Sequence, residues 1–307
     1  MPVSEQSTEP LPKAVSDVLA SEVKSVDVPE SQPTVDRLPI SVSIIASNAA
    51  DKLQRCLASV ADWVSEITVV VNDCTDDTVA VAESFGARVY EHEWHGFRDQ
   101  KNIALNYPNQ PWVLALDTDE VVSPELRDEI ATFFEQDAQT YQGAKFPRKD
   151  WFLGRWITHG DWYPDHSLRL FRAENGIWGG SPEHDKIVLN GRCKTLAADL
   201  LHYSNPTLNS QISKINVFSD VFLQRQLDAG KRWSLMRCLF RPTWRFFRAY
   251  ILRRGFLDGF PGFYIACMTT FSTFVRYSRL YEHHQTAPVN SEQINPDQSG
   301  EQQAADV

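Results

Sequence analysis

The sequence of 307 residues lacks the markers of several protein classes. Its five cysteines are scattered, odd in number and without a Cys-x-x-Cys pair, which argues against a disulfide framework or a zinc site and fits a reducing compartment. Neither GxGxxG nor GxxxxGKS/T occurs, so the dinucleotide-binding and P-loop fingerprints are absent. The polar, acidic N-terminus has no basic segment followed by an apolar stretch. We therefore expect no secretory signal, and a location in the cytoplasm or at the cytoplasmic face of a membrane.

Charge is distributed unevenly along the chain, although the net charge is −10. Residues 231–280 carry ten basic residues and a single acid, Asp258. The segments 1–37 and 283–307 are polar and acidic without an apolar period, and both are predicted to be disordered tails. The basic block therefore indicates a partner, whereas the overall acidity says little.

Between the tails, β-branched runs alternate with segments of helical spacing. This alternation predicts an α/β fold with a doubly wound, mostly parallel sheet. The expected strands are Ser41–Ala46, Ile67–Val71, Arg88–Glu93 and Trp112–Leu116, and the expected helices are Asp51–Trp63, Thr75–Phe85 and Asp99–Asn106. A further helix should begin at Ser123, because Ser-Pro-Glu supplies an N-cap, an N1 proline and an acid in the first turn.

The apolar run Trp112–Leu116 ends abruptly in two carboxylates, Asp117 and Asp119. A buried strand that reaches the surface with acidic side chains at its C-terminal end is how an open α/β sheet presents a ligand site. Two such oxygen ligands suit Mg²⁺ or Mn²⁺, which leaves its other positions to phosphates and water. The pattern therefore predicts the handling of a nucleotide diphosphate.

Several further motifs follow one another in a recognisable order. They are Ser43-Ile44-Ile45, residues 72–78 (NDCTDDT), 96–102 (GFRDQKN), 116–120 (LDTDE), 152–156 (FLGRW), 163–165 (YPD), 168–172 (LRLFR) and 253–259 (RRGFLDG). Together, over roughly residues 40–282, they resemble the family 2 glycosyltransferases of GT-A fold. More narrowly, they resemble the lipopolysaccharide-core β-1,4-glucosyltransferase group.

The resemblance implies an inverting, metal-dependent transferase that moves a hexose, most simply glucose from UDP-glucose, to a lipid-linked or lipopolysaccharide-core saccharide. Residues 38–230 would form the GT-A domain. Asp117 would face the sugar or ribose, and Asp119 would be the main ligand of Mg²⁺ or Mn²⁺. Lys101, early in a short helix, would offer its charge to the diphosphate; a solvated helix lysine is the alternative.

An inverting transferase also needs a carboxylate that takes the proton of the acceptor hydroxyl. Related sequences carry a His-Glu pair after the Leu-Arg-Leu-Phe-Arg motif, where this chain has Glu183-His184-Asp185. Asp185 is our preferred base, and Glu183 and Asp165 are its rivals. A polar loop without a catalytic role is the alternative.

Two other features concern the donor. Asn72-Asp73 departs from the acidic pair that the family usually has at the end of its second strand, which leaves Asp73 as the candidate contact for the uracil. Arg169 and Arg172 alternate with Leu168, Leu170 and Phe171, which we interpret as placing both arginines on one face of a strand. Either could hold phosphate bidentately, or both could be surface residues.

The basic block contains an amphipathic helix. Its apolar stripe is Met236, Phe240, Trp244, Phe247 and Ile251, and Arg237, Arg241, Arg245 and Arg248 follow another face. This pattern predicts a membrane-associated helical region over residues 231–282, attached at the surface, because Phe260–Val275 is too short for a confident span. A packed helix with snorkelling arginines is the alternative, and nucleic-acid binding is not favoured because no matching fold is present.

Two other functions remain open at this point. A non-catalytic GT-A-like protein would bind nucleotide or saccharide without turnover. A nucleotidyltransferase would release pyrophosphate from a nucleoside triphosphate, but the Gly-rich phosphate loop that it needs after the first strand is missing.

Overall fold

The structure is a computed structural model that describes residues 37–181, 184–204 and 207–286. Of the two predicted tails, residues 1–36 and 287–307 lie outside the described residues, as does the candidate Glu183. Residues 283–286 of the second predicted tail are helical, because the last helix runs to Thr286.

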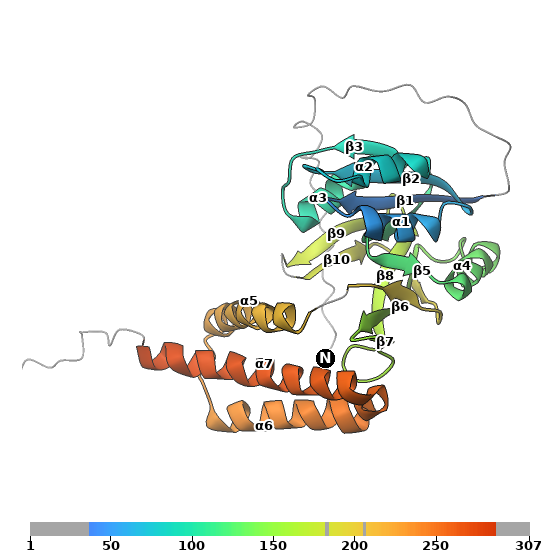
Figure 1. The fold of residues 1–307 in the computed structure, drawn as a ribbon. Coiled ribbons are helices and arrows are strands. Elements are labelled where there is room, and N and C mark those ends of the chain that lie inside the picture. Colours follow the sequence, from blue (N-terminus) through green and yellow to red (C-terminus); the bar gives the residue numbers. More distant parts are fainter. Residues whose placement is uncertain (1–36, 182–183, 205–206, 287–307) are drawn as a thin grey trace, which may run out of the picture. The chain divides into compact units, whose positions relative to one another are not determined.

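The first half of the described chain is the predicted α/β unit (Figure 1). Its strands pair in parallel in the order β3-β2-β1-β4, as expected from their alternation with helices. The strands are β1 (Leu38–Ala46), β2 (Val64–Val71), β3 (Arg88–Glu91) and β4 (Trp112–Leu116), and the helices between them are α1 (Ala50–Ala58), α2 (Thr78–Ser84) and α3 (Phe97–Ala104). Helix α1 ends at Ala58, short of the expected Trp63.

Beyond β4 the same sheet becomes mixed. Strand β8 (Asp165–Arg172) runs antiparallel to β4 and to β6 (Gly143–Phe152). The order then continues through β12 (Leu200–His202) to β5 (Glu120–Val122). The shorter strands β7 (Arg155–Trp156) and β11 (Cys193–Thr195) pair with β6. Helix α4 (Pro124–Gln136) begins as predicted, with the Ser123 hydroxyl accepting from the backbone N–H of Leu126.

Both faces of β4 are covered, which explains why every residue of this strand is buried. One face joins the main core with β1, α1 and α4. The other face carries Val113 and Ala115, which pack against Trp178 and Ile187 of a separate hairpin. This hairpin consists of β9 (Gly176–Ser181) and β10 (His184–Leu189). It brings residue 185 toward the C-terminal end of β4.

The C-terminal helices pack around α7 (Gly259–Thr286), with both α5 (Leu208–Asp228) and α6 (Leu235–Phe246) against it (Figure 1). Between α6 and α7 lie a π-helical segment, η1 (Phe247–Leu252), and a 3₁₀ turn, η2 (Gly255–Asp258). Among the described residues, no helix combines the length and the apolar character that crossing a membrane requires.

Two buried carboxylates tie these helices to the loop before β8. Asp258, fully buried, accepts hydrogen bonds from the backbone N–H groups of Thr158 (3.0 Å) and His159 (2.8 Å) and from the Thr158 hydroxyl. Phe152 and Ile157 pack beside this contact on Ile265 of α7. The loop and the helices are therefore joined by polar and apolar contacts alike.

The second carboxylate, Asp161, corrects one expectation about the basic helix. Its side chain is only 3% exposed and pairs with Arg245, Arg248 and Arg253 at 2.7–3.2 Å. Arg245 and Arg248 were expected to follow the same face as Arg237 and Arg241. They differ from those two in pairing with a buried carboxylate from a distant segment, although their own side chains stay 43% and 37% exposed.

Candidate functional site

The carboxyl ends of β1, β2 and β4 lie at one edge of the sheet, because these strands are adjacent and parallel. Asp117, Thr118 and Asp119 follow β4 directly, and Glu120 opens β5. The predicted acidic pair therefore sits where open α/β sheets bind ligands.

Asp117 is held between two cationic side chains. Its carboxylate oxygens lie 2.8 Å from Lys101 Nζ and 2.6 Å from Arg169 Nη2. Burial acts to raise the pKa of Asp117, but the charges of Arg169 and Lys101 outweigh it and hold the pKa well below its ordinary value. Asp117 is thus ionised at neutral pH, with both oxygens already engaged.

Arg169 also binds Glu120, at 2.5 Å, and Glu120 in turn accepts a hydrogen bond from the backbone N–H of Asp117 (3.0 Å). Glu120 is completely buried. The pKa of Arg169 is raised, because the charges of Asp117 and Glu120 outweigh the effect of its burial. Asp117, Glu120 and Arg169 form a closed unit that fixes the turn after β4.

Lys101 connects the acidic pair to the predicted base. Its Nζ lies 2.9 Å from Asp185 Oδ2, as well as 2.8 Å from Asp117 Oδ1. The same ammonium group sits 4.3 Å from the centre of the Trp178 ring, within the range of a cation–π contact. The structure therefore brings Lys101, Asp117 and Asp185 together, although they come from α3, the end of β4 and β10.

Asp119 has different partners. Its carboxylate is 3.4 Å from Lys52 Nζ and 3.4 Å from His202 Nε2, and His202 Nδ1 is hydrogen-bonded to Asp150 at 2.5 Å. Burial lowers the pKa of His202, but the hydrogen bonds with Asp119 and Asp150 outweigh it and raise the pKa to about 9. Without a ligand, Asp119 is neutralised by an imidazolium and an ammonium group.

The side chains around Asp119 fit a divalent cation. A carboxylate on Nδ1 orients an imidazole so that Nε2 can ligate a metal, and Asp150 stands in that position behind His202. Within the described residues, no group of three or more His, Cys, Asp or Glu side chains is arranged to hold a metal ion. Asp119 and His202 would thus supply two protein ligands to a cation bound otherwise by phosphate and water.

A cavity of about 410 Å³ opens beside the acidic pair. Its walls come from the ends of β1 and β2, the start of α3, and Thr118. Trp94 and Phe97, whose rings meet edge to face at 4.9 Å, line it and are substantially exposed. Gln100 also lines it, and neither atom of this buried amide has a hydrogen-bond partner among the described residues. The cavity thus offers flat apolar surfaces and an unpaired amide.

The two residues at the end of β2 differ in their relation to this cavity. Asn72 lines it, and its amide donates to the Asp73 carboxylate (3.2 Å) and to the carbonyl of His92 (3.3 Å). Asp73 is exposed, has a left-handed backbone (φ 43°) and does not line the cavity. The candidate Asp73 therefore lies at the rim rather than on the wall.

The two predicted phosphate-binding arginines are separated, and the expectation of a shared face is wrong. Side chains alternate along a strand, so residues three apart point to opposite faces. Arg169 is buried against Asp117, whereas Arg172 donates to the carbonyl of Ala138 (2.8 Å) and stacks 4.9 Å from the Trp112 ring. Arg172 is not part of the sheet-edge cluster.

The rival base Asp165 begins β8 and pairs with Arg148 at 2.9 Å. Arg148 also approaches Glu120, at 3.6 Å, so Asp165 is linked to the cluster through an arginine. With its side chain 47% exposed, Asp165 is more open to solvent than Asp185, at 23%. Asp185 is therefore joined to the cluster through Lys101, and Asp165 is joined to it through Arg148.

Sequence reasoning missed Glu120, His202, Asp150 and Arg148. The register of the sheet places His202 opposite both Glu120 of β5 and Asp150 of β6. One signal was available: Leu200-Leu201-His202 is a short apolar run that ends in a chemically active side chain, as Trp112–Asp117 is.

Comparisons with known proteins identify the family of this chain. The family model described as "Glycosyl transferase family 2" matches residues 41–187. An uncharacterized glycosyltransferase of Rickettsia felis is 32% identical over 259 residues, which cover 79% of this chain and 89% of that protein. The lipopolysaccharide core biosynthesis glycosyltransferase LpsC of Rhizobium meliloti is 27% identical over 257 residues, which cover 81% of this chain and 94% of LpsC.

Among solved structures, S. aureus TarS 1-349 in complex with UDP-GlcNAc aligns over 80% of this chain and 91% of TarS. The sequence identity is 13% and the TM-score is 0.45, so this alignment supports no statement about the ligands of this chain.

Proposed function

The chain belongs to glycosyl transferase family 2, and we propose that it moves a hexose from a UDP-hexose, most simply UDP-glucose, to a saccharide acceptor carried by a lipid or by lipopolysaccharide core. The observation that carries this proposal is the arrangement at the end of β4. There, Thr118, which stands between Asp117 and Asp119, lines a cavity fit for a nucleoside, and Lys101 joins Asp117 to Asp185. Membership of this family decides against the nucleotidyltransferase considered above.

In the proposed complex, the uracil occupies the cavity beside α3. Trp94 and Phe97 supply apolar ring surfaces, and the unpaired amide of Gln100 offers both a donor and an acceptor. A pyrimidine edge carries the complementary groups. This arrangement compensates for the acid that Asn72 replaces, and Asp73 at the rim is left to contact the outer edge of the nucleoside.

Asp119 and His202 would hold Mg²⁺ or Mn²⁺, which would neutralise the diphosphate leaving group as the bond to the sugar breaks. His202 must lose its proton to act as a ligand, and Asp150 then keeps its ring oriented. Asp117 stays bound to Arg169, so its role is to position the turn and to contact the sugar or ribose.

Asp185 accepts the proton of the acceptor hydroxyl in this proposal, and the reaction inverts the anomeric centre. Lys101 can pair with the incoming diphosphate only by loosening its contacts with Asp117 and Asp185. Binding of the donor therefore releases the base from its ion pair. This gives Lys101 two roles, as a diphosphate contact and as the partner that neutralises Asp185 before the donor arrives.

We further propose that the enzyme contacts the membrane through α6 and the segments next to it. The predicted apolar stripe is exposed in the structure, from Met236 at 75% and Phe240 at 64% to Trp244 at 47%. Arg237 and Arg241 lie exposed beside it, and neither has an acidic partner among the described residues. Apolar side chains next to unpaired arginines suit the surface of an anionic membrane. The proposal places the enzyme at the cytoplasmic face.

The first experiment is a panel of sugar nucleotides incubated with the full chain, Mn²⁺ or Mg²⁺ and a membrane extract as acceptor source. We expect UDP to be released from UDP-glucose, and we expect chelation to abolish the release. Asp128→Asn, on the exposed side of α4, is the matched control for every acidic variant. Release that survives chelation would refute the role of the cation, and no release from any donor would refute the proposed substrates.

A further inference from the structure

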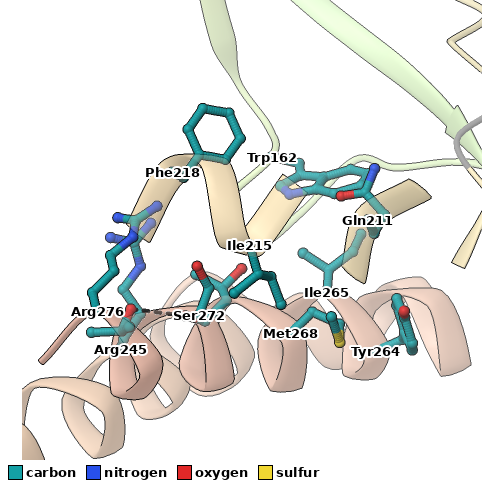
Figure 2. Close-up of a pocket in the computed structure, with 12 residues that line it drawn as sticks. Trp162, Gln211, Ile215, Phe218, Arg245, Tyr264, Ile265, Met268, Ser272 and Arg276 are labelled. Carbon is teal, nitrogen blue, oxygen red and sulfur yellow. Dashed lines mark hydrogen bonds between the residues drawn. The ribbon is translucent and has the colours of Figure 1, made fainter. Parts of the chain in front are cut away.

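A second cavity, of about 360 Å³, lies among the C-terminal helices, away from the acidic pair. It is enclosed by α5 and α7, with Arg245 contributed by α6 and Trp162 by the loop before β8 (Figure 2). Arg245 and Arg276 gather at one end, and Trp162, Tyr264 and Ile265 at the other (Figure 2). The cavity therefore has a cationic end and an aromatic end.

The cationic end carries positive charge that the described residues do not balance. Arg245 pairs with Asp161, but that carboxylate is shared with two other arginines. Arg276 has no acidic partner among the described residues, and its Nε is buried without a hydrogen bond. Burial, and secondarily the charge of Arg245, lowers the pKa of Arg276. A partly buried guanidinium with a buried, unpaired Nε and no counter-charge favours an anion at this end of the cavity.

Hydroxyl groups extend the same surface. Ser272 lies one helical turn before Arg276 on α7 and lines the cavity with it. The Tyr264 hydroxyl, toward the aromatic end, is buried and has no hydrogen-bond partner among the described residues. A hydroxyl donor such as that of Ser272 near two guanidinium groups is the chemistry that recognises phosphate oxygens. The ring of Trp162 offers a flat surface for a sugar or another carbon skeleton.

From this charge and hydroxyl arrangement we propose that the cavity binds a phosphate group, through Arg276 with Arg245 and Ser272. Its position suggests the carrier. Trp244, next to Arg245 in the chain, belongs to the exposed apolar stripe of α6, so the proposed contact of this stripe with a membrane would bring lipid phosphates near the cavity. The ligand class is thus a phosphorylated lipid or saccharide.

The cavity is connected along the chain to Asp165, the rival candidate base. Trp162 is three residues before Asp165, and three extended residues span at most about 11 Å. A molecule whose phosphate rests on Arg276 and whose body lies along Trp162 would direct its far end toward the carboxylates. The conclusion that this phosphate belongs to the acceptor rests on the proposed transferase function, whereas the phosphate site itself does not.

Two variants of the full chain test the site. Arg276→Gln removes the unpaired charge but keeps a long polar side chain. Ser272→Asp places a carboxylate one turn from Arg276, where it can pair with that arginine and exclude phosphate. Arg237→Gln makes the same charge change on the exposed face of α6 and is the control. Because Arg276 has no acidic partner to lose, we expect neither variant to lower Tm.

The readouts need no donor and no turnover, so their outcome is independent of the transfer assay. The first is cosedimentation with phosphatidylcholine vesicles that contain either phosphatidic acid or phosphatidylglycerol at matched surface charge. The second is the rise in Tm caused by inorganic phosphate. We expect Arg276→Gln and Ser272→Asp to weaken binding to phosphatidic acid roughly tenfold, and binding to phosphatidylglycerol by about twofold or less. Arg237→Gln should weaken both alike.

Each outcome decides the proposal. A selective loss on phosphatidic acid vesicles supports a lipid phosphate. A phosphate-dependent rise in Tm that both pocket variants abolish supports a soluble phosphate carrier. If Arg276→Gln and Arg237→Gln act equally on both vesicle types, and the effect of phosphate on Tm does not depend on Arg276, the cavity is not a phosphate site.

Discussion

Carboxylates surrounded by cationic side chains occur in two regions, the sheet edge and the attachment of the C-terminal helices. Asp161 and Asp258 in the attachment are 3% and 0% exposed, and each is held by donors from the segment opposite its own. Asp117 and Asp119 at the sheet edge keep 29% and 18% of their side-chain surface exposed beside an open cavity. The difference teaches that an acid–base cluster serves binding only where its partners can be exchanged for a ligand.

The largest effect should come from the sheet edge. Asp119→Asn removes one proposed ligand of the cation, and loss of several kcal/mol of charge stabilisation lowers turnover about a thousandfold or more. Its effect on stability should be small, which urea unfolding would check beside the kinetics. Asp128→Asn should change neither quantity. Turnover within a few-fold of the unmodified enzyme would remove Asp119 from the metal site.

The attachment should show the opposite behaviour. Asp161→Asn leaves Arg245, Arg248 and Arg253 without their shared counter-charge, and breaking a buried ion pair costs about 3 kcal/mol of unfolding free energy or more. The matched control is Asp62→Asn, which breaks an exposed pair with Arg127 and should cost about 1 kcal/mol or less. Equal losses in urea unfolding would abolish the distinction between the two regions.

Asp185→Asn sharpens the assignment within the sheet edge. Loss of a general base lowers kcat about a hundredfold or more, while KM for the donor should stay within a few-fold. Asp165→Asn, at the rival carboxylate, should have a much smaller effect on kcat. If kcat falls more for Asp165→Asn, the proton goes to Asp165, and Asp185 serves only to hold Lys101.

The smallest effect concerns the exposed face of α6. Arg237→Gln and Arg241→Gln should each weaken binding to anionic vesicles by about 1 kcal/mol, roughly fivefold, because each charge acts separately near the surface. Neither variant should alter stability, in contrast to changes at Arg245 or Arg248. Unaltered vesicle binding of the double variant would return α6 to the packed-helix interpretation.

The sequence predicted correctly those parts of the fold that depend on residues close together in the chain. The buried run Trp112–Leu116, the N-cap at Ser123 and the alternation of strands with helices all follow from nearby residues, and the structure confirms them. The position of the acidic pair followed as well, because parallel strands end at a common edge.

Contacts between segments that are far apart in the sequence could not be predicted from these local patterns. His202 reaches Asp119 through the pairing of β12 with β5 and β6, and Arg245 pairs with Asp161, which arrives from the loop before β8. The wrong prediction for Arg172 had another cause. Side chains alternate along a strand, so the sequence alone should have placed Arg172 and Arg169 on opposite faces. Asp185 was brought to Lys101 by a hairpin on the back of β4, which no local spacing reveals.

The ammonium group of Lys101 can pair with only a few anions at once. Before any substrate binds, it is paired with both Asp117 and Asp185. An acceptor that entered first would meet a carboxylate already occupied by this ammonium group. The proposed mechanism therefore implies a compulsory order of substrate addition, with the sugar nucleotide first, and protects the enzyme from activating an acceptor that has nothing to attack.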